Sequence, residues 1–127
     1  MDFTTNKPIY QHIYDIITER IILGQLREGD RVPSVRELAV ELQVNPNTVM
    51  RAYDALCAGG IIASSRGIGY FVSEGAAERA LAESRREFIE GEMVTLFRRM
   101  TTLGISAEEL STLYNNYKTE QNDENKQ

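Results

Sequence analysis

The chain has 127 residues, a hydrophobic fraction of 42% and a formal net charge of −5, which suits one globular domain with a short extension. This length excludes a barrel enzyme or a separate large ligand domain, and a single cysteine with a single histidine excludes an intramolecular disulfide and a zinc finger. The acidic balance argues against non-specific coating of nucleic acid. The lack of a signal peptide or long apolar run predicts a cytoplasmic chain without a membrane span.

The first predicted element is an amphipathic helix near the N-terminus. It opens at Pro8, because proline loses no hydrogen bond at the first helical position. Isoleucines then recur at spacings of three and four as far as Ile21, and Gly24 is a suitable end. A short second helix begins at a capping box, in which the Ser34 hydroxyl accepts a hydrogen bond from the Glu37 amide.

A third helix and a hairpin complete this part of the chain. Asn45 is a favourable N-cap, and the helix that it opens carries an apolar face and ends at a glycine pair. Two short strands are predicted at residues 61–64 and 69–72, with residues 65–68 as the tip between them. The order helix, helix, helix, hairpin therefore describes residues 1–74.

The second half of the chain is rich in alanine, glutamate and arginine, which favour a long helix that ends at Gly104. Its apolar residues repeat with a heptad-like period: Ala82, Ile89, Met93, Leu96, Met100 and Leu103. A second capping box at residues 106–109 opens a final helix, which can fold back over part of this seam. Residues 75–118 are thus predicted to be a two-helix dimerisation region, in which the last five seam residues meet a second copy. The polar residues 119–127 are predicted to be disordered.

Two short helices joined by a tight turn and followed by a hairpin are typical of a winged helix-turn-helix, so the fold class is mainly α with a small β-hairpin. Polar side chains near the start of the third helix, those of Asn47, Thr48 and Arg51, are suited to a major groove. At the hairpin tip, Arg66 is suited to a minor groove, because the neighbouring Gly67 lets the backbone approach closely.

The segment GDRVPSVRELAVELQVNPNTVMRAYDALCAGGIIASSRGIGYFV resembles the DNA-binding domain of the GntR family of bacterial transcription regulators. The matching positions stand in a fixed order: Gly29, Pro33-Ser34, Arg36-Glu37-Leu38-Ala39, Thr48-Val49, Ala52-Tyr53, Leu56, Gly60, Arg66-Gly67, Gly69 and Phe71-Val72. The opening helix, KPIYQHIYDII, is similar as well, so the resemblance covers residues 7–73. NPNTVMRAY resembles the short YtrA-like branch, in which only a pair of helices follows the DNA-binding domain.

The resemblance implies a sequence-specific DNA-binding regulator of transcription, and short members of the family often act as repressors. The apolar seam predicts a homodimer, and a two-fold dimer predicts an inverted-repeat operator. The resemblance implies no catalytic residue, no metal and no cofactor, and it leaves room for an unidentified small-molecule effector. The DNA-contacting positions that it implies are Ser34, Arg36, Asn47, Thr48, Arg66 and Gly67. Many family members carry base-reading arginines where this chain has Pro46 and Met50. Asn47 and Arg51 are therefore the candidates for base readout here, since asparagine pairs with adenine and arginine with guanine.

Several of these residues also have a plainer interpretation. Arg36 and Arg51 could each pair with an acidic neighbour, Glu41 among them, and Arg66 could be an ordinary exposed residue of a hairpin. Asn45 is a cap rather than a base reader. The stripe of Phe88, Met93, Phe97 and Met100 could line a ligand pocket instead of packing against a helix.

Two other classes of function remain as alternatives. An enzyme would need a nucleophile with a base, a metal set or a phosphate-binding loop, and the single His12 and Cys57 stand in different predicted helices. A winged helix can also bind protein instead of DNA. That alternative is favoured if Arg36 and Arg66 are buried in ion pairs.

Overall fold

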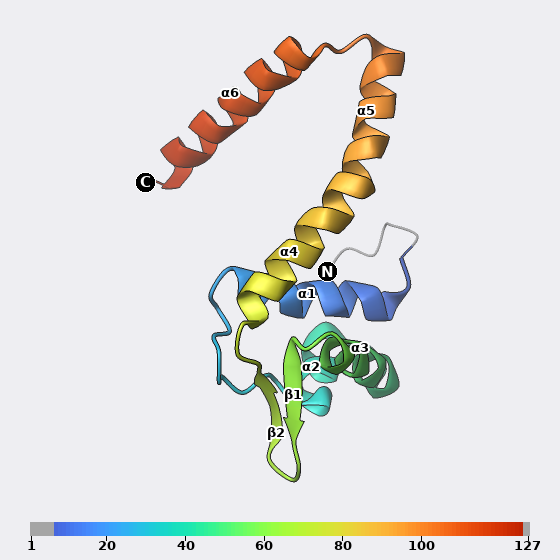
Figure 1. Cartoon of the computed structure of the whole chain (residues 1–127), viewed down its shortest axis with the longest axis vertical. Helices are drawn as coiled ribbons and strands as arrows, with labels where there is room; N and C mark the ends of the chain where they lie inside the picture. Colours follow the sequence, from blue (N-terminus) through green and yellow to red (C-terminus); the bar gives the residue numbers. More distant parts are fainter. Residues whose placement is uncertain (1–6, 126–127) are drawn as a thin grey trace. The chain divides into compact units, whose positions relative to one another are not determined.

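The computed structural model describes residues 7–125. Its elements follow in the order α1 (Ile9–Ile22), α2 (Val35–Leu42), α3 (Pro46–Ala58), β1 (Ile62–Ser65), β2 (Gly69–Val72), α4 (Ala76–Glu90), α5 (Glu92–Leu103) and α6 (Ala107–Asn125) (Figure 1). The chain divides into two compact units, residues 1–85 and residues 86–127, and the boundary lies within α4.

The core of the first unit is formed by the apolar helix faces that the sequence predicts. Ile13 and Ile17 of α1, Leu38 of α2, and Val49 and Leu56 of α3 are all fully buried. α3 packs against both α1 and α2. Each side chain of this size contributes roughly 1.5–3 kcal/mol when it is buried. The core therefore fixes α3 at several points along its length.

The predicted N-terminal caps of α2 and α3 are both confirmed. The Ser34 hydroxyl accepts a hydrogen bond from the Glu37 amide at 3.1 Å. The Asn45 side-chain oxygen accepts one from the Asn47 amide at 2.8 Å. α2 ends at Leu42, and the C-cap residue Gln43 that follows has φ 57° and ψ 48°. This left-handed residue turns the chain sharply, so that α3 begins only a few residues later.

The predicted hairpin is confirmed as well. β1 and β2 pair antiparallel with Ile62 opposite Val72, so the first strand begins one residue later than predicted. The segment before α2 lies along the other edge of β2: the Val32 amide donates to the Tyr70 carbonyl at 2.8 Å, and the Val72 amide donates to the Asp30 carbonyl at 2.9 Å. These bonds hold the base of the hairpin against the helical core.

The start of α4 belongs to the first unit. Ala76 and Ala80 are buried in its core, where their small side chains allow close packing. The Arg79 guanidinium donates to the Gly60 carbonyl oxygen at 2.7 Å, which ties α4 to the turn after α3. The predicted boundary at residue 74 therefore falls inside this unit, which extends to residue 85.

The single long helix that the sequence predicts before Gly104 is divided in two. Between α4 and α5, Gly91 has φ −112° and ψ −83°, outside the helical region. The residues around Gly91 favour helix, but only proline has a lower helix propensity than glycine. The helix therefore breaks at Gly91. α5 ends at Gly104, as predicted, with a φ of 71°.

α6 confirms the second capping box, since the Ser106 hydroxyl accepts a hydrogen bond from the Glu109 amide at 3.1 Å. The same helix corrects the predicted disordered tail, because it continues to Asn125. Residues added to an existing helix avoid the cost of nucleation. The Thr119 hydroxyl also donates to the Asn115 carbonyl at 3.0 Å. Residues 126 and 127 of the predicted tail lie outside the described residues.

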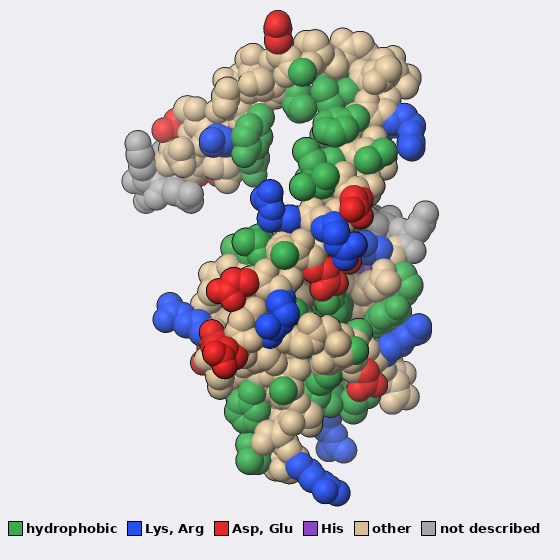
Figure 2. Space-filling model, in the orientation of Figure 1, with side chains coloured by type: hydrophobic (Ala, Val, Ile, Leu, Met, Phe, Trp, Pro, Cys, Tyr) green, Lys and Arg blue, Asp and Glu red, His purple; other side chains and the backbone are tan. Residues whose placement is uncertain are grey.

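The second unit leaves much of its apolar surface uncovered. Of the five predicted dimerisation residues, Met100 is buried and Met93 half-buried, whereas Ile89, Leu96 and Leu103 are 49%, 42% and 61% exposed. α6 covers little of this seam, and its own large side chains are exposed as well: Leu113, Tyr114 and Tyr117. Figure 2 shows hydrophobic side chains on the sides of α5 and α6 that face one another across an open space.

Candidate nucleic-acid interface

The start of α3 presents the predicted polar side chains. Asn47 and Arg51 are exposed and Thr48 is half-buried, whereas the opposite face of the helix, which includes Val49 and Ala52, is fully buried. The cap at Asn45 satisfies the Asn47 amide, so the Asn47 side chain is not needed to stabilise the helix start. The polar face of α3 is thus available for a ligand.

Tyr53 connects α3 to the two other elements of this face. Its hydroxyl donates a hydrogen bond to the Pro33 carbonyl oxygen, just before the Ser34 cap of α2. Its ring contacts that of Tyr70 on β2 edge to face, with centroids 5.0 Å apart. Burial raises the pKa of Tyr53 far above its ordinary value of 10.0, so the hydroxyl stays protonated and remains a donor.

None of the three arginines predicted on this face is held in an ion pair. Between described residues, the salt bridges join Lys7 with Asp15, Arg20 with Glu41, and Arg86 with Glu90. Glu41, an expected partner of Arg36 or Arg51, is thus taken by Arg20 at 3.0 Å. Arg36, Arg51 and Arg66 are all exposed. The plainer interpretation of Arg36 and Arg51 as members of ion pairs with acidic neighbours is therefore wrong.

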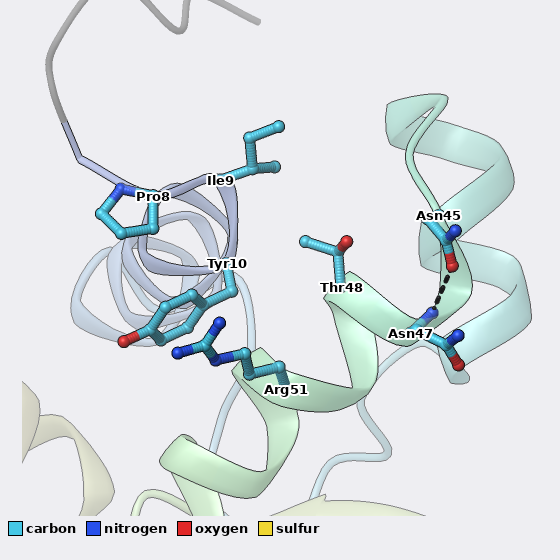
Figure 3. Close-up of a pocket in the computed structure, with 7 residues that line it drawn as sticks. All are labelled: Pro8, Ile9, Tyr10, Asn45, Asn47, Thr48 and Arg51. Atoms are coloured by element: carbon cyan, nitrogen blue, oxygen red, sulfur yellow. Dashed lines mark hydrogen bonds between the residues drawn. The ribbon is translucent and has the colours of Figure 1, made fainter.

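Arg51 contacts an aromatic ring instead. Its guanidinium carbon lies 4.1 Å from the centroid of the Tyr10 ring on α1. Figure 3 shows this side chain reaching from α3 toward Tyr10, while Asn47 points away from α1. The two helices border a shallow pocket lined by Pro8, Ile9, Tyr10, Asn45, Asn47, Thr48 and Arg51. No pattern in the sequence singles out Tyr10, because only the packing of α1 against α3 brings it beside Arg51.

The hairpin tip carries the third predicted contact. Arg66, Gly67 and Ile68 are all exposed, and Gly67 has a φ of 76°, which favours glycine in this turn. Figure 2 shows Lys or Arg side chains on one side of this end of the hairpin. Arg31 is exposed as well and lies against the hairpin, since its Nε is only 3.0 Å from where a Cβ on Gly69 would stand. It belongs to the segment before α2, which pairs with β2 through a bridge between Arg31 and Phe71.

Within residues 7–125, no helix is long and apolar enough to cross a membrane, and no three His, Cys, Asp or Glu side chains are grouped to hold a metal ion. Cys57 is half-buried in α3. Desolvation raises the pKa of its thiol, and the nearby Asp54 adds to the shift, so the reactive thiolate is disfavoured.

Comparison with known proteins places these features in a family. Residues 9–72 match the family described as bacterial regulatory proteins, gntR family. YtrA of Bacillus subtilis (strain 168), an HTH-type transcriptional repressor, is 36% identical over 110 residues, which are 87% of this chain and 84% of that protein.

Solved structures of transcription regulators are similar to this chain as well. A transcriptional regulator of the GntR family from Bacteroides thetaiotaomicron has a TM-score of 0.72 at 41% identity, and the match covers 90% of this chain and 99% of that one. The DNA-binding domain of AraR, solved in complex with operator ORR3, has a TM-score of 0.53 at 25% identity over 57% of this chain and 88% of that one.

Proposed function

The chain belongs to the GntR family of bacterial regulatory proteins and is a DNA-binding transcription regulator, and from this premise we propose that it is a homodimeric repressor of an inverted-repeat operator. The resemblance to this family and to its YtrA-like branch, which the sequence indicated, is confirmed. The relatives are transcription regulators, and we infer that this chain likewise acts without catalysis.

The observation that carries the DNA-binding face is the set of three exposed arginines without ion pairs, on elements held together through Tyr53. We infer that the start of α3 enters a major groove, that the start of α2 lies on the phosphate backbone, and that the hairpin tip reaches a minor groove. The residues assigned to these contacts are Ser34, Arg36, Asn47, Thr48, Arg51, Arg66 and Gly67.

The dimer is inferred from the second unit. Monomeric proteins rarely expose a row of large apolar side chains such as Ile89, Leu96 and Leu103. A chain with a net charge of −5 gains little from long-range attraction to DNA, so a single winged domain binds weakly. Two linked copies make the second contact intramolecular, which raises affinity by about 10²–10⁴. A two-fold dimer then requires an inverted repeat.

The proposal also includes the direction of regulation, which is repression. It is supported by YtrA, whose name describes a repressor. A dimer bound across a promoter would compete with RNA polymerase for the same DNA, and this mechanism needs no small-molecule effector. Because bacterial DNA lies in the cytoplasm, the proposal places the protein there.

Selection of bound duplexes from a random pool tests this function with the full-length chain. We expect one enriched inverted repeat whose half-sites lie about 10 base pairs or somewhat more apart from centre to centre. A reporter driven by a promoter that contains this repeat should fall in expression when the protein is present. An unenriched pool would contradict sequence-specific binding and favour the protein-binding alternative, and a rise in expression would contradict repression.

A further inference from the structure

The contact between Tyr10 and Arg51 joins two helices of the first unit. Tyr10 is half-buried and packs against the hydrophobic core, so its ring stands on a fixed support. Arg51 is exposed, and its guanidinium carbon lies 4.1 Å from the centre of that ring. Figure 3 shows the two side chains meeting beside the start of α3. The partner of the arginine is therefore a residue outside the helix-turn-helix.

A guanidinium that lies over an aromatic ring keeps its hydrogen-bond donors free. Its N–H groups lie in its own plane and point outward, so stacking on a ring does not occupy them. Within residues 7–125, Arg51 forms no hydrogen bond or ion pair that would compete for these donors. The ring thus restricts the orientation of a long flexible side chain, while the paired N–H donors of the guanidinium stay free to bind guanine.

We propose that Tyr10 is a positioning residue for base readout: its ring holds the Arg51 guanidinium in the orientation that reads one base pair of each half-site. This inference rests on the proposed function, in which Arg51 enters the major groove. Arginine is the expected reader of guanine, so the base pair concerned is a G·C pair. Sequence preference then depends on α1 as well as on α3.

The hydroxyl of Tyr10 is not required by this role. Among the described residues it accepts only a long hydrogen bond from the Gln11 side chain, at 3.4 Å, whereas the ring face makes the contact with Arg51. Tyr10→Phe should therefore behave as the wild type, because the phenyl ring also offers a π-face to a cation. Tyr10→Leu keeps apolar bulk against the core and removes the π-face, so it separates stacking from packing.

The test uses full-length protein and the operator selected from a random pool. Affinities are measured for the operator, for versions with each base pair changed in turn, and for scrambled DNA. We expect Tyr10→Leu to lower discrimination at one G·C pair by about 3- to 10-fold and to leave affinity for scrambled DNA unchanged, while Tyr10→Phe restores discrimination. In an Arg51→Ala background, Tyr10→Leu should have no further effect on discrimination.

Three outcomes would overturn the inference. They are unchanged discrimination in Tyr10→Leu, an equal loss in Tyr10→Leu and Tyr10→Phe, and a loss of the same size when Arg51 is already alanine. Thermal melts accompany each variant, and Tyr10→Met replaces Tyr10→Leu if the latter does not fold. If the wild-type protein selects no sequence at all, the proposed function fails together with the inference. If it selects an operator and the variants behave as in any of the three outcomes, only the inference fails.

Discussion

At the scale of single residues, two arginines of the proposed interface have no ion-pair partner among the described residues. Arg36 and Arg66 are exposed, and no salt bridge between described residues includes them. An exposed arginine of this kind contributes little to folding and keeps its charge and donors for DNA. Substitutions here should separate binding from stability.

Arg66→Ala should weaken operator binding and make its dependence on salt shallower, because one cationic contact with the DNA fewer releases fewer counterions. The slope of log K against log salt should decrease in magnitude by about one unit for each lost contact, and the thermal midpoint should stay nearly constant. Arg85→Ala removes the same charge from an exposed position on α4 and serves as the control. Equal affinity and slope in Arg66→Ala and the wild type would remove the hairpin tip from the mechanism.

Asn47→Ala and Arg51→Ala should relax sequence preference more than they reduce non-specific binding. Each base contact is worth about 1–3 kcal/mol of discrimination. The measurement compares affinity for the selected operator with affinity for scrambled DNA of the same length. A uniform loss on both would show that these two residues contact phosphates instead of bases.

At the scale of elements, Tyr53 connects α3 both to the turn before α2 and to β2. Tyr53→Phe should lower the free energy of unfolding by about 1 kcal/mol or more, because the Pro33 carbonyl oxygen loses its donor. Chemical denaturation measures this change, and an unchanged midpoint would show that the hydrogen bond contributes nothing.

The same residue predicts a pH dependence. Burial raises the pKa of Tyr53 in the folded state above its ordinary value of 10.0, so above pH 10 the unfolded chain loses this proton first. The free energy of unfolding should therefore fall as the pH rises beyond 10, and it should fall less steeply in Tyr53→Phe. Parallel pH profiles for the two proteins would contradict this assignment.

Removal of residues 119–127 should change neither folding nor operator binding. Residues 119–124 are helical and exposed, and none of them is apolar, so they bury no large apolar side chain that could stabilise the rest of the chain. Circular dichroism should show only the loss of the truncated helical residues. A lower affinity for the operator would mean that this part of α6 contacts DNA or a second copy.

Local signals in the sequence predicted most of the elements. They missed one break within a helix and one contact that depends on long-range packing. Ser34, Asn45 and Ser106 cap their helices as predicted, because a cap involves only neighbouring residues. The break at Gly91 depends on one weak helix former within a strongly helical segment, and no local pattern identified it. The placement of Tyr10 beside Arg51 requires the packing of α1 on α3.

At the scale of the whole molecule, we propose that a second copy of the chain covers the apolar seam of α5. Leu96→Glu places a charge in the middle of the seam and should convert the dimer to a monomer and lower operator affinity by about 10²-fold or more. Thr102→Glu adds the same charge outside the heptad positions of α5 and is the matched control. A Leu96→Glu protein that remains dimeric would place the subunit interface elsewhere.

The central claim is that two chains bind one operator together, and the mass of the protein–operator complex tests it most directly. Light scattering of the full-length protein with a duplex that carries the selected repeat should give the mass of that duplex plus two chains of 14.4 kDa each. A complex that holds a single chain at saturating protein would contradict the account, and the exposed seam of α5 would then have to serve another partner.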